Sequence, residues 1–289
     1  MDLKTWKKNG QYFTYKGEHP VFFQDEGNGE VLLLLHGFPT ASWDWHKIWT
    51  PLRDRYRLIA ADFIGFGYSA KPFAYAYSIL DQADLIEALL QHLRIDTVHV
   101  LAHDYGDTVL QELLARTQDR KKKGAQGLKI ESVVLLNGGL FPETHRPRPI
   151  QKALISPVGL LFTPFLNKQK LKKNFHEIFG EATPPSDQEI AEFYDLLSFD
   201  RGKYIFHKLI RYMQERKQYR ERWVNALQTA EQPIRLINGG ADPISGKHMV
   251  ERYQELIPMA DVVLFDDIGH YPQTEAPDRL LKHYLEFRD

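Results

Sequence analysis

The chain of 289 residues contains no cysteine. The protein can therefore form neither a disulfide nor a zinc–thiolate site, and it has no thiol to act as a nucleophile. Any covalent chemistry must come from another kind of side chain.

An excess of charge is also missing. The 37 lysines and arginines are balanced by 38 aspartates and glutamates, and the formal net charge is -1. Proteins that bind nucleic acid carry a marked positive charge, because they neutralise phosphates. We therefore expect no nucleic-acid partner.

Long apolar segments are absent as well. A membrane-spanning helix needs roughly 20 consecutive apolar residues, and no stretch of this chain provides them. The first ten residues contain three lysines and lack the apolar core of a signal peptide. We expect a cytoplasmic protein without a membrane span, whose oligomeric state the sequence leaves open.

Short apolar runs alternate with helix-like segments along most of the chain, which predicts an α/β fold with a mostly parallel sheet. The run from Val31 to Leu35 is unbroken, as expected for a central strand that is buried on both faces. The rhythm stops after Leu136 and resumes at Ile234, and the residues between them form helical patterns separated by prolines. We expect a core made of residues 1–137 and 230–289, with a helical cap at residues 138–229.

The most informative segment is Ala102-His103-Asp104-Tyr105-Gly106, which follows an apolar run and opens a helix-like stretch. Small residues flank one presented side chain, as in the sharp strand-to-helix turn called a nucleophile elbow. Here that side chain is Asp104. A carboxylate at this place can displace a leaving group from an alkyl carbon, whereas a serine would attack acyl carbons. The plain alternative is an aspartate that only caps a helix.

Two further polar residues follow predicted strands near the C-terminus. Asp242 follows the run Ile234–Ile237, and His270 follows the run Asp261–Phe265. Open α/β sheets keep their sites at the carboxyl ends of the strands. The order nucleophile, acid, histidine is the order that accompanies a nucleophile elbow. We therefore predict a triad of Asp104, Asp242 and His270.

The loop after Val31–Leu35 reads His36-Gly37-Phe38-Pro39 and supplies the remaining expected group. In this arrangement the backbone N–H of Phe38 points to the top of the sheet beside the N–H of Tyr105. We predict that these two donors hold the oxyanion that forms when the Asp104 carbonyl is attacked.

These residues resemble the α/β-hydrolase superfamily, in the branch with an aspartate nucleophile that holds epoxide hydrolases and haloalkane dehalogenases. The resemblance covers nearly the whole chain. Within the branch it is closest to the mesoderm-specific transcript protein group, judged by three strings: His36–Thr40 with Asp44-Trp45, His103–Asp107, and Asn137–Gly139 leading to Phe141–Pro147. The resemblance implies the α/β-hydrolase fold, with a mostly parallel central sheet flanked by helices and an inserted helical cap.

The resemblance also implies a mechanism. Asp104 attacks a carbon that bears a leaving group and forms an alkyl-enzyme ester, and His270, oriented by Asp242, activates the water that hydrolyses it. The partners are a small apolar substrate and water, and neither a metal nor an organic cofactor is expected. An epoxide is favoured, because dehalogenases commonly have a tryptophan and an asparagine where this chain has Tyr105 and Phe38. Two departures weaken the epoxide hypothesis. Epoxide hydrolases usually have a glutamate where this chain has Thr40 and a tryptophan where it has Tyr105.

The proton donor for an epoxide oxygen is expected on the cap, and Tyr212 is the candidate, with ring packing as its alternative role. Further expected substrate contacts are His36, Trp43, Phe141 and His145. Asp107 lies on the opening turn of the predicted helix, where the exposed N–H groups and the helix dipole favour its negative charge. That is its whole role, or else it raises the pKa of Asp104 by like-charge repulsion.

Three alternatives to epoxide hydrolysis stay open. They are haloalkane dehalogenation, hydrolysis of an ester by water without covalent attack, and a weakly active or inactive ligand-binding or regulatory homologue.

Overall fold

A computed structural model describes residues 1–289 and contains one sheet of eight strands in the order β1-β2-β4-β3-β5-β6-β7-β8. The first two strands pair antiparallel, β2 pairs antiparallel with β4, and all other pairs are parallel. The strand bounds are β1 Gln11–Tyr15, β2 His19–Glu26, β3 Val31–Leu35, β4 Arg57–Ala61, β5 Thr97–His103, β6 Lys129–Leu136, β7 Ile234–Gly239 and β8 Asp261–Phe265. The predicted α/β class and mostly parallel sheet are confirmed.

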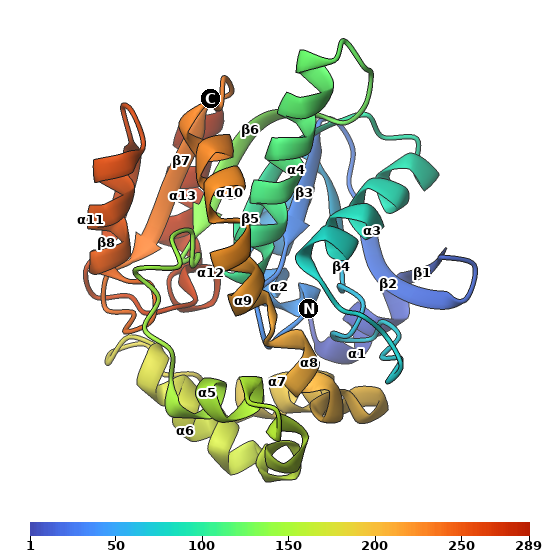
Figure 1. The fold of residues 1–289 in the computed structure, drawn as a ribbon, viewed down its shortest axis with the longest axis vertical. Helices are drawn as coiled ribbons and strands as arrows, with labels where there is room; N and C mark the ends of the chain where they lie inside the picture. The colour runs from blue at the N-terminus through green and yellow to red at the C-terminus, as the bar shows by residue number, and fades with distance from the viewer.

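Helices cover both faces of the sheet (Figure 1). In the N-terminal part they are α1 Leu3–Asn9, α2 His46–Arg53, α3 Ile79–His92 and α4 Tyr105–Lys122. The middle part has α5 Pro149–Ile155, α6 Lys168–Ile178, α7 Asp187–Ser198, α8 Phe206–Leu209, α9 Tyr212–Gln218 and α10 Arg220–Gln228. The last part has α11 Lys247–Leu256, α12 Pro272–Glu275 and α13 Pro277–Arg288. None of these helices has the length and apolar character needed to cross a membrane.

Two hydrophobic cores lie on opposite faces of the sheet because successive strand residues point to opposite sides. In β3, Leu33 and Leu35 belong to one core, and Leu32 and Leu34 to the other. All four are at most 1% exposed. This explains why β3 is an unbroken aliphatic run rather than an alternating one.

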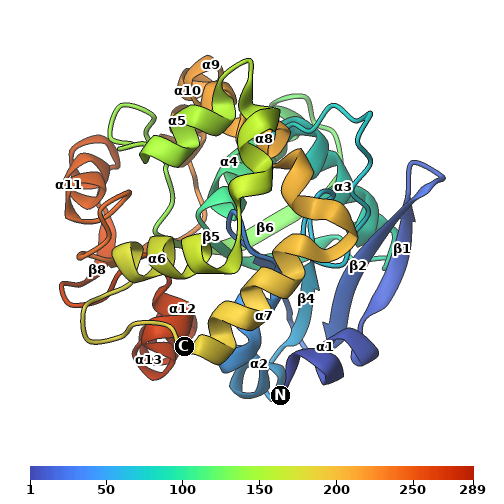
Figure 2. The same cartoon turned by 90° about the horizontal axis from the view of Figure 1, so that it is seen from below.

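The helices α5 to α8 lie together at one end of the molecule, beyond the end of β5 that leads into α4 (Figures 1 and 2). Three short 3₁₀ segments accompany the fold, namely η1 Ser42–Trp45, η2 Gly159–Phe165 and η3 Phe199–Ile205. By contrast, α10 packs along α4. The carboxyl ends of β3, β5, β7 and β8 thus face a layer of helices formed by the middle of the chain.

Candidate active site

Asp104 lies at the turn between β5 and α4, and its backbone is in an unusual conformation. Its φ is 45° and its ψ is -99°, a region that side-chain-bearing residues rarely adopt. Gly106 makes the turn possible, because a Cβ there would lie 2.2 Å from the carbonyl oxygen of Leu35. This strained turn presents the Asp104 carboxylate above the sheet edge, as predicted for a nucleophile elbow.

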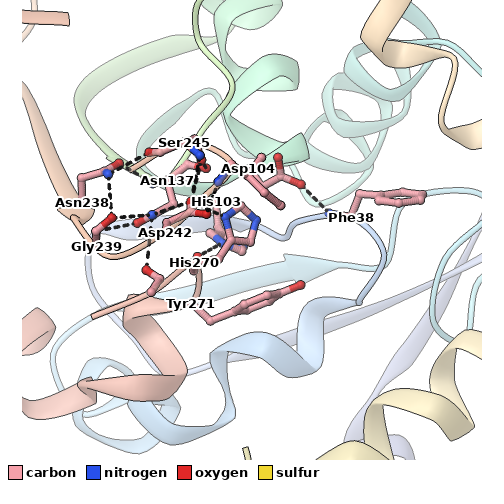
Figure 3. Close-up of polar contacts among 12 residues, drawn as sticks. Phe38, His103, Asp104, Asn137, Asn238, Gly239, Asp242, Ser245, His270 and Tyr271 are labelled. Atoms are coloured by element: carbon pink, nitrogen blue, oxygen red, sulfur yellow. Dashed lines mark hydrogen bonds and ion pairs between the residues drawn. The ribbon is translucent and has the colours of Figure 1, made fainter. Parts of the chain in front are cut away.

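The loop after β3 contacts this carboxylate directly. The backbone N–H of Phe38 donates to Oδ2 of Asp104 at 3.1 Å (Figure 3). Tyr105 is the first residue of α4, so its N–H is one of the four at a helix N-terminus that have no acceptor within the helix. The structure therefore brings Phe38 to the predicted position beside Asp104 and leaves Tyr105 at the start of the helix.

Asp242 and His270 form a buried pair at the carboxyl ends of β7 and β8. Nδ1 of His270 lies 2.7 Å from Oδ2 of Asp242, and both residues are 3% exposed. A carboxylate only accepts hydrogen bonds, so Nδ1 carries the proton and Nε2 is the ring nitrogen turned away from Asp242. His270 and Asp104 both line one cavity, which brings the three predicted triad residues together.

Charge keeps His270 protonated in the resting protein. Burial disfavours the imidazolium, but the charges of Asp242 and Asp104 and the hydrogen bond to Asp242 outweigh it and raise the pKa of His270 to about 9. Burial likewise opposes ionisation of Asp242, yet His270 holds the pKa of Asp242 at about 2. At neutral pH the site thus contains two carboxylates and one imidazolium.

This electrostatic arrangement predicts an unusual histidine titration. His270 will titrate near pH 9 instead of its ordinary 6.5, and the Asp242→Asn variant will shift this pKa far downward because burial then meets less opposition. NMR titration of labelled histidines measures both values. Because the folded pKa lies above the unfolded one, this ionisation stabilises the fold fully below about pH 6.5, and the stabilisation is lost as pH rises through about 9. A His270 pKa below 6.5 in the wild-type protein would contradict the assignment.

Asn137, at the end of β6, is a supporting residue that the sequence did not single out as part of the site. Its side-chain amide donates to Asp242 Oδ2 at 3.0 Å, and its Oδ1 accepts from the N–H of Gly239 at 2.8 Å. Ser245 donates from Oγ to the same Asp242 oxygen at 2.8 Å. These bonds fix the Asp242 carboxylate for His270 (Figure 3).

His103 supports His270 from the other side. Its Nε2 donates to the backbone carbonyl of His270 at 2.8 Å, and burial lowers the pKa of His103 to about 3. A neutral imidazole therefore packs between the elbow and the loop after β8. The position next to Asp104 was predicted only as part of the elbow, without this role.

Arg216, on α9, is the largest addition to the predicted site. Arg216 is 2% exposed, and its Nη2 donates to the Asp104 carbonyl oxygen at 3.0 Å and lies 3.4 Å from Asp104 Oδ1. Nε donates to Thr108 Oγ1 at 2.7 Å. Burial alone would raise the pKa of Asp104, but Arg216 and then His270 overcome it and hold that pKa below its ordinary value. The buried carboxylate is therefore ionised.

The environment of Asp107 matches neither of the two roles expected for it. It is fully buried, and neither of its carboxyl oxygens has a side-chain or backbone partner. Burial and then repulsion from Asp104 raise the pKa of Asp107 well above its ordinary value. The repulsion between the two carboxyl groups therefore opposes ionisation of Asp107, whereas Arg216 and His270 favour the charged form of Asp104.

The cavity that joins these residues has a volume of about 100 Å³. It contains Tyr212 and His145 among the residues predicted to contact substrate. Its lining is Phe38, Pro39, Asp104, His145, Arg148, Ile150, Gln151, Leu171, Asn174, Phe175, Ile178, Tyr212, Ile244 and His270. A larger polar surface groove, of about 1140 Å³, lies between the end of α4 and β6 and contains none of the predicted site residues.

Three predicted substrate contacts lie outside this lining. His36 is fully buried, and its Nε2 accepts the backbone N–H of Phe63 at 3.1 Å, so it braces two loops. Trp43 stacks on His46 at 4.1 Å between ring centres. Phe141 is fully buried and packs near Tyr253. Their aromatic rings serve packing, which composition and position along the chain did not distinguish from substrate contact.

Tyr212 packs into the site from the start of α9. Its ring lies 5.0 Å from that of Tyr105 and 5.8 Å from that of Phe38, between ring centres. The guanidinium carbon of Arg216 lies 4.5 Å from its ring centre. Tyr212 therefore closes the cavity above the elbow, and burial raises its pKa, which keeps the phenol protonated.

Comparisons with known proteins agree with this architecture. The model of the alpha/beta hydrolase family matches residues 32–283. The mesoderm-specific transcript homolog protein of Bos taurus is 42% identical, over 99% of this chain and 87% of that protein. The putative hydrolase LipZ of Mycobacterium tuberculosis is 35% identical, over 95% and 94% of the two chains.

More distant proteins carry several different activity names. A cis-3-alkyl-4-alkyloxetan-2-one decarboxylase of Shewanella oneidensis is 26% identical over 96% of this chain and 87% of its own length. The solved haloalkane dehalogenase DatA of Agrobacterium tumefaciens superposes with a TM-score of 0.78 at 22% identity, covering 96% of both chains. The solved epoxide hydrolase CorEH superposes with a TM-score of 0.72 at 20% identity, covering 96% of this chain and 97% of that one.

The strand order, the elbow after β5 and the match to the family model support the same assignment. The similarity to the mesoderm-specific transcript homolog protein extends over nearly the full chain. The chain belongs to the alpha/beta hydrolase family.

Proposed function

We propose that this protein is a hydrolase that uses Asp104 as a nucleophile toward a carbon bearing a leaving group, with an epoxide as the preferred substrate. The observation that carries the proposal is the ionised Asp104 carboxylate on the elbow, in the same cavity as the His270–Asp242 pair. A carboxylate in this place forms a stable ester with an alkyl carbon, and a histidine base is then needed to activate the water that hydrolyses this ester.

In the first step Asp104 forms a C–O bond to the substrate carbon, and the bond from that carbon to the epoxide oxygen breaks. The leaving oxygen takes a proton from the Tyr212 phenol, which regains one from the His270 imidazolium directly or through water. His270 is then neutral and is able to act as a base.

In the second step His270 removes a proton from water, and the hydroxide attacks the carbonyl carbon of the Asp104 ester. Phe38 and Tyr105 donate their N–H groups to the oxyanion. The intermediate collapses to the free Asp104 carboxylate and a diol, and the proton held by His270 returns the site to its resting charge. Arg216 stabilises the carboxylate as it is released.

The substrate is expected to be small and largely apolar. The cavity of about 100 Å³ is half lined by hydrophobic residues, including Leu171, Phe175 and Ile178 from α6. These three come from the layer of helices that we propose as a cap, which excludes water from the ester during its formation.

Isotope labelling tests the covalent route. In a single turnover in H₂¹⁸O with excess enzyme, the oxygen added to the product comes from Asp104, and the label enters the Asp104 carboxylate. Mass spectrometry of the product and of the peptide containing Asp104 distinguishes the two fates. Label in the product of the first turnover would instead indicate direct attack by water and would overturn the covalent route.

The leaving group is tested by a substrate panel. It contains alkyl and aryl epoxides, bromoalkanes, simple esters and an alkyl oxetan-2-one, the last because a decarboxylase of such a compound is among the relatives. Diol formation from an epoxide supports the proposal. Bromide release without diol formation would favour a dehalogenase, and no turnover of any member would favour a ligand-binding homologue.

Replacing Tyr212 by phenylalanine will distinguish the epoxide hydrolase hypothesis from the haloalkane dehalogenase hypothesis. The variant keeps the ring that packs on Tyr105 but cannot donate a proton. We expect epoxide opening to fall by about a hundredfold, while displacement of bromide, which needs no proton, stays near the wild-type rate. Stopped-flow measurement of the first step with both substrates gives the comparison. Equal effects on both substrates would show that Tyr212 serves packing only.

A further inference from the structure

The segment that connects α5 and α6 exposes an unusual number of large apolar side chains. Leu161 is 68% exposed and Phe165 is 57% exposed. We call this set the cap patch, and its members are Val158, Leu160, Leu161, Phe162 and Phe165. All five lie within eight consecutive residues, on and just before η2.

Such a cluster requires an explanation because single exposed apolar residues are common but contiguous ones are not. In the same segment the small residues Gly159 and Thr163 are buried. The large side chains therefore remain at the surface, and Leu160 borders a surface groove that Phe73 and Tyr204 also line.

Positive charge surrounds the cap patch. Residues 146–180 contain seven lysines and arginines and one glutamate, although the whole chain has a net charge of -1. Lys152 precedes the patch, and Lys168, Lys170 and Lys173 follow it, all four exposed to solvent. Lys170 lies over the ring of Phe165, with Nζ 5.1 Å from the ring centre. Lys170 thus adjoins the cap patch directly, and the other three lysines lie close to it along the chain.

We propose that the cap patch binds the surface of a membrane that contains anionic phospholipids. The apolar side chains enter the boundary between headgroups and acyl chains, and the lysines contact the lipid phosphates. The protein then lies on the membrane without spanning it.

A second copy of the chain fits this surface less well. Two copies joined through the cap patch would bring the same lysine-rich segments together, and like charges across an interface are unfavourable. Lysine is also depleted at protein–protein interfaces. An anionic bilayer, by contrast, complements both the apolar centre and its basic border.

The position of the cap patch links membrane contact to the cavity. Ile150 and Gln151 of α5 and Leu171 and Phe175 of α6 line the cavity on the inner side, and the cap patch lies on the segment that joins these two helices. A substrate dissolved in the bilayer would thus meet the protein at the segment next to its cavity. This consequence rests on the proposed function, whereas membrane binding itself does not.

Vesicle flotation tests the proposal without any substrate. The full chain is mixed with vesicles of phosphatidylcholine alone, or of phosphatidylcholine and phosphatidylglycerol in equal parts. We expect the wild-type protein to float with the anionic vesicles and to be released by high salt. The double variant L161E/F165E will bind these vesicles at least about tenfold more weakly, and the triple variant K168E/K170E/K173E will show a similar or larger loss.

Matched variants elsewhere control for surface chemistry. Met259 is fully exposed in the loop before β8, and M259E changes an apolar residue to an acid away from the cap patch. The triple variant K121E/K122E/K123E reverses three charges at the end of α4, at the opposite end of the molecule from α5 and α6 (Figure 1). Circular dichroism checks folding, and we expect both controls to bind like wild type.

Three results would overturn the proposal. The first is a wild-type protein that floats with neither kind of vesicle. The second is equal loss of binding in the control triple variant, which would indicate attraction by charge alone. The third is a dimer, detected by light scattering and abolished by L161E/F165E, without vesicle binding, which would assign the cap patch to a second copy.

Discussion

The Asp104→Asn variant will lose turnover by about four orders of magnitude or more, the scale seen when a covalent nucleophile is removed. The amide cannot form the alkyl-enzyme ester, whereas the Phe38 N–H, which donates to Oδ2 of Asp104, still finds an oxygen at that place. Steady-state assays with the best substrate of the panel give the ratio of kcat/KM. Measurements are made promptly on fresh protein, so that deamidation does not restore the aspartate.

Asp107→Asn is the matched control for this variant. Asp107 is another buried aspartate, three residues further along at the start of the same helix, and burial and repulsion from Asp104 favour its protonated form. We expect its replacement to change kcat/KM by less than about tenfold. If Asp104→Asn retained turnover within about tenfold of wild type, hydrolysis by His270-activated water without covalent attack would replace the proposed mechanism.

Replacing Arg216 by methionine will have the second largest effect. The change removes the cation that lies 3.4 Å from Asp104 Oδ1 and leaves Asp104 as a buried carboxylate with only His270 as a nearby charge of opposite sign. Breaking a buried ion pair in this way typically destabilises a protein by about 3 to 5 kcal/mol. The pKa of Asp104 will rise, because burial is the largest opposing effect on that group.

The activity of Arg216→Met will therefore depend on pH in a way that simple loss of packing does not produce. Below the raised pKa of Asp104 the nucleophile is protonated and the first step is slow, and the rate recovers as pH rises and Asp104 ionises. Rapid-mixing measurement of ester formation against pH reads this out, and Arg216→Lys should retain most of the charge effect. A pH profile identical to wild type would show that Arg216 is only structural.

Arg222→Met provides the comparison. Arg222 lies on α10 in a partly exposed ion pair with Glu112 and Asp119. Glu112 is buried, but in this variant it keeps its hydrogen bonds to Arg116 and to the Trp223 indole, so the carboxylate is not left without partners. This variant should unfold near the wild-type temperature and show the wild-type pH profile.

The turn at Asp104 and the proximity of Asp104, Asp242 and His270 were predictable from sequence because local requirements fix them. The turn after β5 needs small residues beside the presented side chain, and Ala102 and Gly106 satisfy this need within five residues. Asp242 and His270 follow short apolar strands, and parallel strands bring their carboxyl ends to one edge of the sheet. Chain order alone then predicts which residues meet.

Arg216 and Asn137 were not identified as site residues, for a physical reason. A lysine- or arginine-rich helix turn such as Glu215–Lys217 ordinarily faces water, and only the packing of α9 over the elbow makes Arg216 a buried partner of Asp104. Asn137 follows a strand as many polar residues do, and its bond to Asp242 depends on the neighbouring β7 loop. Both roles come from contacts between segments about 100 residues apart.

The exposed cap patch also defeats simple sequence reasoning. The string Gly159-Leu160-Leu161-Phe162 is typical of a buried core segment. The structure instead turns the large side chains outward. Whether an apolar string is buried depends on what packs against it, and this information lies outside the string itself.

Nucleophilic attack by Asp104 is tested most directly by mass spectrometry of the intact His270→Gln protein, mixed with the panel of epoxides, bromoalkanes and the oxetan-2-one. Without the base the ester cannot be hydrolysed quickly, so we predict that the protein gains the mass of one reacting substrate, less hydrogen bromide in the bromoalkane case, and that digestion locates the adduct on Asp104. The Asp104→Asn, His270→Gln double variant should show none. An adduct on another residue, or turnover of a substrate by wild type with no adduct in His270→Gln, would contradict the proposal that Asp104 is the nucleophile.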